Sequence, residues 1–383
     1  MKKLLLSSAA LCGLAMVATP ASAQISLDVG GHFKGYAAYV DQDENNGNVN
    51  DIDFIRNTEV HLSGETTLDT GLTVGFHTEA EVDATQNDLA NNVGGDSFNV
   101  DESYIYMSGS WGRVNVGDED GASYLLQVAA PSADSNIDGI RQFVNPVNYG
   151  ALLTVADAAA APGLLPIIGA QNSGGIDYDA DASGKSTKLT YLSPIVSGFQ
   201  LGLSYSPDTD AANENGIGTD DIPGEIGATY EVAGRYEGNF NNVGFILGAG
   251  YSSGDLEADL AGFDDREVFN VGVDLDLGPI GIGAIYREDN GGVDGATADD
   301  EETIVVGVDY TTGPFKLGAS YYTQDNTFAI RDLDTERYSG GVAYSYGPGM
   351  SFRGSVGYVE HDGAALTTDV DATYVTLGTQ INF

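Results

Sequence analysis

The feature that most constrains this chain is a two-residue alternation of apolar and polar side chains, interrupted at intervals by tight turns. Residues 60–82 read VHLSGETTLDTGLTVGFHTEAEV. On both sides of LDTG, apolar side chains occupy every second position, while His, Ser, Thr and Glu fill many of the positions between. Such a period of two places alternate side chains on opposite faces of a β-strand. The segment therefore predicts a hairpin with one apolar face and one carboxylate-rich face.

The connections between such strands fall into two length classes. The short turns are rich in Gly, Pro and Asn, which supply the positive or fixed φ of tight reversals: LDTG (68–71), SGSWGR (108–113), SPIVSG (193–198), EGNFNN (237–242), DLGP (276–279), TTGP (311–314) and YGPG (346–349). The long segments are acidic: 41–51, 84–98, 118–175, 206–225, 253–265, 288–302, 323–334 and 361–369. Seven short and eight long connections make fifteen, which predicts sixteen strands.

Sorting by length is informative because the two classes alternate along the chain. All short turns then lie at one end of the sheet and all long loops at the other. Outer-membrane barrels have this asymmetry, with short periplasmic turns, long outer loops and an even number of strands. Strands in lipid must close into a barrel to pair every backbone group, and about sixteen strands leave an aqueous lumen. We therefore expect an all-β, sixteen-stranded antiparallel transmembrane barrel.

The first 23 residues have the pattern of a secretory signal peptide. Lys2 and Lys3 precede a short apolar stretch, and the sequence ASA ends at Ala23. Cleavage there would remove Cys12, the only cysteine, and leave residues 24–383 as a single barrel domain without a disulfide or a Cys-ligated metal. We expect export to the outer membrane of a Gram-negative bacterium.

The charge balance excludes some partners. The chain carries 57 acidic and 15 basic residues, a formal net charge of −42. Such a surface disfavours nucleic acid and anionic lipid. No apolar run in 24–383 is long enough for a spanning helix, because Asp and Pro interrupt the nearest one, at 151–170.

The polar face of each strand would line the lumen, and Val, Leu, Phe and Tyr would face lipid. By alternation, the predicted pore wall near the N-terminus consists of His32, Lys34, Glu59, His61, Glu65, His77, Glu79, Glu81 and Arg113. A carboxylate-rich lumen concentrates cations and repels anions, which predicts a cation preference.

At this point the chain resembles a known family, the general diffusion porins of Gram-negative outer membranes, and most of all their alphaproteobacterial, Rhodobacter-type branch. The resemblance covers essentially all of 24–383. It rests on the order and spacing of GETTLDTGLTVGFHTEAE, SGSWGRVNVGD, YLSPIVSGFQLGLSYSP, FNVGVDLDLGPIGIGAIY and the terminal INF.

The resemblance implies a homotrimer and a long third loop, here 118–175, folded into the barrel to narrow the pore. It also implies that loop acids face basic groups on the opposite wall. The matching acids are Asp118, Glu119, Asp120, Asp134 and Asp138. The wall departs from the family at Glu59, Glu79 and Glu81, which are acidic where an arginine cluster would be expected.

Metal sites are less well specified by the sequence. Asp118, Glu119 and Asp120 could form a weak calcium site, but the several oxygens that Ca²⁺ requires are not all visible. His61 and His77 could bind Zn²⁺ across their hairpin, although no motif supplies a third ligand. We expect no resident cofactor.

The sequence thus predicts a passive pore for small hydrophilic solutes and cations, embedded among outer-membrane lipid and lipopolysaccharide. No nucleophile motif accompanies the histidines, so we expect no enzyme activity. Two alternatives remain. A substrate-selective channel would show an aromatic track along the lumen, which we do not identify. A secreted calcium-binding adhesin would show a G-G-x-G-x-D repeat, which the chain lacks.

Overall fold

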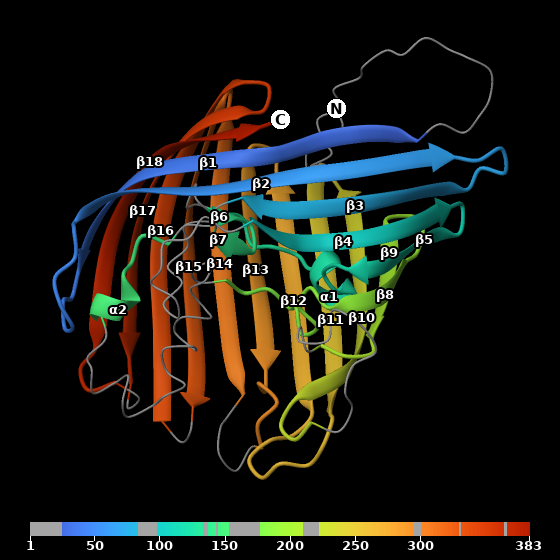
Figure 1. The fold of residues 1–383 in the computed structure, drawn as a ribbon. Helices are drawn as coiled ribbons and strands as arrows, with labels where there is room; N and C mark the ends of the chain where they lie inside the picture. Colours follow the sequence, from blue (N-terminus) through green and yellow to red (C-terminus); the bar gives the residue numbers. More distant parts are fainter. Residues whose placement is uncertain are drawn as a thin grey trace.

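Alternating strands of this chain close on themselves into a barrel, shown in Figure 1. The computed structural model describes residues 25–82, 98–132, 137–142, 145–152, 177–209, 222–294, 300–328, 331–363 and 366–383. The predicted signal peptide (1–23) and Asp134 therefore lie outside the described residues. No helix in these ranges is long and apolar enough to cross a membrane.

Sixteen strands make up the barrel wall, and every neighbouring pair is antiparallel, as the sequence predicted. They are β1 (Ser26–Gln42), β2 (Ile52–Thr67), β3 (Thr73–Val82), β4 (Phe98–Gly109), β5 (Gly112–Asp118), β8 (Thr187–Leu192), β9 (Phe199–Ser206), β10 (Ile226–Phe240), β11 (Val243–Leu256), β12 (Arg266–Leu277), β13 (Ile280–Asp289), β14 (Glu301–Thr312), β15 (Phe315–Phe328), β16 (Arg331–Gly347), β17 (Met350–Asp362) and β18 (Val370–Asn382).

The barrel closes between the first and last strands. The β1–β18 ladder runs from His32 opposite Asn382 to Gln42 opposite Ala372. The first and last strands meet at the short-turn end, where the Gly31 amide donates to the Phe383 carbonyl at 3.0 Å. Closure leaves no strand edge in the wall, so each spanning strand has a partner on both sides.

Local turn chemistry explains why the short connections reverse the chain so tightly. Gly278 and Gly313 adopt φ of 72° and 56° in the β12–β13 and β14–β15 turns. Asn241 and Asn242 take φ of 47° and 69° between β10 and β11, the pattern of a type I′ hairpin turn. All seven predicted short turns connect strands of the wall.

Two of the predicted long loops are shorter than expected. Segment 323–334 belongs mostly to β15 and β16, whose ladder continues until Phe328 faces Arg331. Segment 288–302 includes the paired ends of β13 and β14, where Asp289 faces Glu301. Acidic residues there were interpreted as loop, but their alternation continues the strands. The strand count is unaffected.

The outward face is apolar and bordered by aromatic residues at both ends. Along β16, Tyr338 and Tyr346 both face outward, 50% and 40% exposed. Their eight-residue separation corresponds to about 27 Å of strand at roughly 3.4 Å per residue, comparable with an apolar band about 25 Å tall. Tyr338 packs against Tyr321 and Tyr346 against Phe352, with ring centroids 4.9 and 4.5 Å apart. The outer surface therefore has the dimensions of a membrane span.

Candidate pore lining and constriction loop

The inner face of β1 to β5 carries every predicted wall residue. Burial alternates along β1, where Lys34 is 1% exposed and its outward neighbour Phe33 is 38% exposed. Cross-strand register places His32 opposite Glu59, Glu59 opposite Glu81, and His61 opposite Glu79, so these side chains share one face. The parity prediction therefore gives the correct orientation here. Arg56, in contrast, lies in regular β2 with outward parity.

Three histidines and two glutamates of this face form a connected cluster, which we call the histidine wall: His32, Glu59, His61, His77 and Glu79. The Glu59 carboxylate lies 3.1 Å from His61 Nε2 and 3.6 Å from His32 Nδ1. The Glu79 carboxylate lies 3.3 Å from His61 Nδ1 and 2.7 Å from His77 Nε2. Register explains the cluster, because β1, β2 and β3 are consecutive neighbours in the sheet.

The cluster continues along the wall through aromatic contacts. The His77 ring lies 5.4 Å from the Tyr104 ring of β4. The Arg113 guanidinium stacks over Tyr106 at 3.9 Å, and the Tyr106 hydroxyl donates to Glu65 at 2.7 Å. Glu65 and Arg113 are thus linked through one tyrosine toward the short-turn end of the wall.

The third loop folds into the barrel and lies against its inner face. It connects β5 to β8, so it spans 119–186, longer than the predicted 118–175, and Asp118 belongs to β5. Its described elements are α1 (Ala122–Leu125), β6 (Ile137–Asp138), β7 (Arg141–Gln142) and α2 (Tyr149–Leu152). The boundary at 175 was wrong because 177–182 also packs in the interior, with Tyr178 2% exposed.

Glycines of the wall allow the loop backbone to approach closely. A Cβ added at Gly307 would lie 2.0 Å from the Pro131 carbonyl oxygen, and one at Gly248 would lie 2.6 Å from the Val128 side chain. The Ser123 amide donates to the Glu231 carboxylate of β10 at 2.9 Å. Residues 121–131 are therefore fitted against β9 to β14.

The predicted loop acids have separate local partners. Asp118 accepts a hydrogen bond from Thr187, and Glu119 accepts one from Asn115 at 2.7 Å. Asp120 pairs with Lys185 at 3.2 Å and Arg141 at 3.8 Å.

Arg141 and Lys185 belong to the loop itself, so Asp120 is neutralised within the loop and not across the pore. Asp118, Glu119 and Asp120 do not form a converging metal-ligand group among the described residues. The backbone of Asp138 lies in β6.

Burial sets the protonation of the loop carboxyls. Burial, and then the neighbouring Asp179, raises the pKa of Asp177 to about 7. Burial also raises the pKa of Asp181 well above its ordinary value, and that of Glu119 moves in the same direction. Burial lowers the pKa of Lys185, but Asp120 and Glu102 more than compensate and raise it. Burial thus favours the neutral form of these three carboxyl groups.

A second charged cluster, which the sequence did not predict, lies on β12 to β14: Arg266, Arg287, Asp289 and Glu301. We call it the arginine wall. Asp289 accepts two hydrogen bonds from Arg266, at 2.7 and 3.1 Å, and one from Arg287 at 2.5 Å. Arg287 also pairs with Glu301. A possible sequence signal was the alternation of Arg287 with Asp289, which predicts a shared face.

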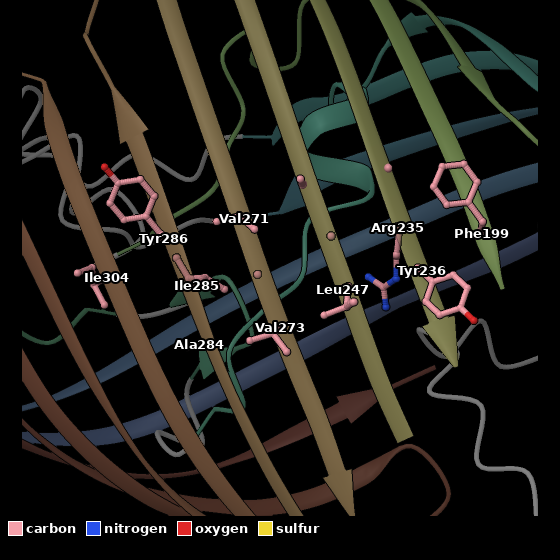
Figure 2. A pocket seen from close by; sticks show the side chains of 14 residues that line it. Phe199, Arg235, Tyr236, Leu247, Val271, Val273, Ala284, Ile285, Tyr286 and Ile304 are labelled. Carbon is pink, nitrogen blue, oxygen red and sulfur yellow. The ribbon is translucent and has the colours of Figure 1, made fainter. Parts of the chain in front are cut away.

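A separate apolar depression lies on the outer surface. It has a volume of about 730 Å³ and is formed where small residues, among them Gly234, Ala249 and Ala284, sit between large ones. Figure 2 shows Phe199, Leu247, Val271 and Ile304 spread across neighbouring strands around it. Among its large side chains, Phe199, Leu247, Val271 and Ile304 face outward and are exposed. This depression therefore faces the hydrocarbon and is not part of the solute path.

The family model of the Gram-negative porins matches residues 7–364 of this sequence. The chain belongs to the Gram-negative porin family. The barrel, its short and long connections and its inward loop are thus those of an outer-membrane porin channel.

Solved structures of porins share the fold. The anion-selective porin of Comamonas acidovorans is 17% identical, with a TM-score of 0.60, over 94% of this chain and 100% of that one. A mutant of the Rh. blastica porin is 17% identical with a TM-score of 0.53 over the same shares. A loop-deletion mutant of the Vibrio cholerae outer membrane protein OmpT is 16% identical with a TM-score of 0.58, over 94% of this chain and 99% of that one.

Curated relatives match only in part. An uncharacterised Rickettsia conorii protein is 25% identical over 180 residues, which cover 43% of this chain and 40% of the relative. A Rickettsia felis protein is 26% identical over 180 residues, 43% of this chain and 39% of the relative. The chain thus matches well under half the length of these relatives.

Proposed function

We propose that this porin is a passive channel for small hydrophilic solutes and ions that prefers cations. The observation that carries the proposal is the pairing of charged side chains on the inner wall. Glu59 and Glu79 have salt-bridge partners that are histidines, and histidine carries charge only when protonated. The arginines of β12 and β13, in contrast, are paired with carboxylates.

Electrostatics then favours cations along the path. Carboxylates beside a low-dielectric wall concentrate cations and repel anions. The whole chain adds to this field, with 57 acidic against 15 basic residues. The preference weakens at high salt, because the Debye length falls from about 10 Å at 0.1 M to about 3 Å at 1 M.

Reversal potentials across planar bilayers test the proposal. Purified porin separating 0.1 M from 1 M KCl should give a potential of the sign set by K⁺ permeation, and single-channel conductance should establish the pore. An anion preference would contradict the proposal and would indicate that the arginine wall determines the ion selectivity. A uniform strong preference for one sugar would instead favour the substrate-selective channel.

The oligomeric state and the location of the channel follow from its membership of the porin family. We infer a homotrimer in the outer membrane, with acidic outer loops beside lipopolysaccharide, and export with cleavage after Ala23. Family membership and the apolar outer surface support this. Sedimentation in detergent tests the trimer, and N-terminal sequencing of the mature protein tests cleavage after Ala23. We propose no catalytic activity and no calcium requirement.

A further inference from the structure

We propose that the histidine wall binds one divalent transition-metal ion of the Zn²⁺ type, with His32 Nδ1, Glu59 Oε2 and His61 Nε2 as ligands. A water molecule from the lumen would fill the fourth position. The site goes beyond passive diffusion and does not depend on the selectivity of the channel. It also supplies the third ligand that the sequence left unspecified, although with a different pair of histidines.

The three ligand atoms have the right separation for a small cation. In a tetrahedral site with ligands about 2.0–2.1 Å from zinc, neighbouring ligand atoms lie about 3.3–3.4 Å apart. Glu59 Oε2 lies 3.1 Å from His61 Nε2 and 3.6 Å from His32 Nδ1. All three atoms lie within 4.8 Å of one another. Small side-chain rotations are enough to close them around an ion.

Contacts around the ligands orient both imidazoles for this role. His32 Nε2 lies 2.6 Å from the Oδ1 of Asn57, whose side chain is buried, so Nε2–H donates there and Nδ1 keeps its lone pair. His61 Nδ1 lies 3.3 Å from the Glu79 carboxylate, so the tautomer that binds a metal through Nε2 has its Nδ1 proton beside that carboxylate. Metal-binding histidines commonly have such a partner on the other ring nitrogen.

A second triad, His61, His77 and Glu79, also has its ligand atoms within 4.8 Å of one another. The two triads share His61, and a neutral imidazole has only one nitrogen lone pair for a metal. They are therefore mutually exclusive.

The first triad is favoured because the Asn57 hydrogen bond at Nε2 orients His32 with Nδ1 toward Glu59. His77 then lies outside the ligand set, and its Nε2–H donates to Glu79 at 2.7 Å.

The donor set selects the kind of ion. Two imidazoles and one carboxylate suit Zn²⁺, Ni²⁺, Cu²⁺ or Co²⁺, whereas Ca²⁺ and Mg²⁺ prefer oxygen ligands. The side chains of His32, Glu59 and His61 are 13%, 16% and 30% exposed, so an ion can reach them from the lumen without a change of fold.

Cobalt absorption provides the test, since Co²⁺ reports four-coordination directly and its signal needs no channel activity. The folded, heat-modifiable barrel in detergent should bind about one Co²⁺ per chain, with visible bands that Zn²⁺ abolishes. A hundredfold excess of Ca²⁺ should leave them unchanged. H32Q, H61Q and E59Q should each lose the bands, and N57A should weaken binding about 10- to 100-fold.

His77→Gln is the matched control, because it removes a neighbouring imidazole of the same wall but no ligand. It should retain the bands. Retention by H32Q together with loss in H77Q would overturn the proposed ligand set, as would displacement of Co²⁺ by Ca²⁺. If H61Q does not fold into a heat-modifiable barrel, E59Q and H32Q decide the outcome.

Discussion

The histidine wall and the arginine wall lie on opposite sides of one barrel and solve the problem of internal charge differently. In strand order, β12 and β13 are eight of sixteen positions from β2 and β3. At the arginine wall, Asp289 is held by Arg266 and Arg287 in a nearly buried network. At the histidine wall, carboxylates are separated by imidazoles.

The difference shows that the number of charged side chains on a wall does not determine the net charge that the wall presents to the lumen. The arginine wall cancels its charges internally, so it contributes mainly to stability. The histidine wall retains negative charge whenever its imidazoles are neutral, so it contributes mainly to the field that a permeating ion experiences.

The largest effect is expected from Asp289→Asn. It leaves the partly exposed Arg266 without its carboxylate partner and the buried Arg287 with Glu301 alone, and breaking a buried ion pair costs about 3–5 kcal/mol. Glu79→Gln, in the more exposed histidine wall, should cost less than about 1 kcal/mol. The midpoint of thermal unfolding, followed by heat-modifiable migration, measures both. Equal losses would contradict the division between the two walls.

The next largest effect is expected at the contact between the loop and the barrel. Gly307→Ala places a methyl group against the Pro131 backbone, and overpacking of this kind costs about 1–3 kcal/mol. The loop should move from the wall, and single-channel conductance should change. Gly234→Ala is the control, because its Cβ would meet Phe199 at an ordinary 3.5 Å on the outer face. Unchanged conductance in both variants would argue against a loop fitted to the glycines.

Selectivity should respond to the histidine wall by a smaller amount. Replacing Glu59 and Glu79 of this wall, together with the neighbouring Glu81, by glutamine removes three carboxylates and should lower the K⁺/Cl⁻ permeability ratio about two- to fivefold. Asp289→Asn, if folded, should change the ratio by less than about twofold, because it removes one carboxylate and not three. The reversal potential in a KCl gradient measures both. A larger change in the permeability ratio from Asp289→Asn than from the triple variant would show that the arginine wall, and not the histidine wall, determines the selectivity.

The smallest expected effect is that of pH on the loop. Burial raises the pKa of Asp177 to about 7 and that of Asp181 in the same direction. The folded loop therefore holds protons that an unfolded loop releases above about pH 4, and its stability falls as pH rises from about 4 to 7.

The protection factors of amide hydrogens in 177–186, which correct exchange for the intrinsic rate, should be about two- to fivefold higher at pH 5.5 than at pH 8. The effect is small because the other contacts of the loop persist at both pH values. Faster corrected exchange at pH 5.5 would show that the buried acids are ionised.

Much of the barrel could be predicted because its determinants are local. Alternation sets the face of His61 and Glu79, and turn residues such as Gly278 and Asn241 set where strands reverse. The residues of the histidine wall also come from three strands that are consecutive in sequence, β1, β2 and β3.

The rest depends on contacts between distant segments. The network at Asp289 requires the register of β12 against β13, and its acidic neighbourhood suggested a loop. The path of the third loop depends on Gly307 meeting Pro131, 176 residues earlier in sequence, which no local pattern encodes.

The glycine-lined seat of the third loop has a consequence for the order of assembly. The loop leaves the wall at β5, crosses β9 to β14 and contacts the seam, where Gln142 lies against Tyr374 of β18 and Gln42 of β1 donates to the Asn148 carbonyl. A segment that contacts both β1 and β18 is most easily placed before these two strands pair. The β1–β18 pairing should therefore be the last to form during insertion. Cysteine pairs across that seam, trapped at successive times, should form disulfides after those across β10–β11.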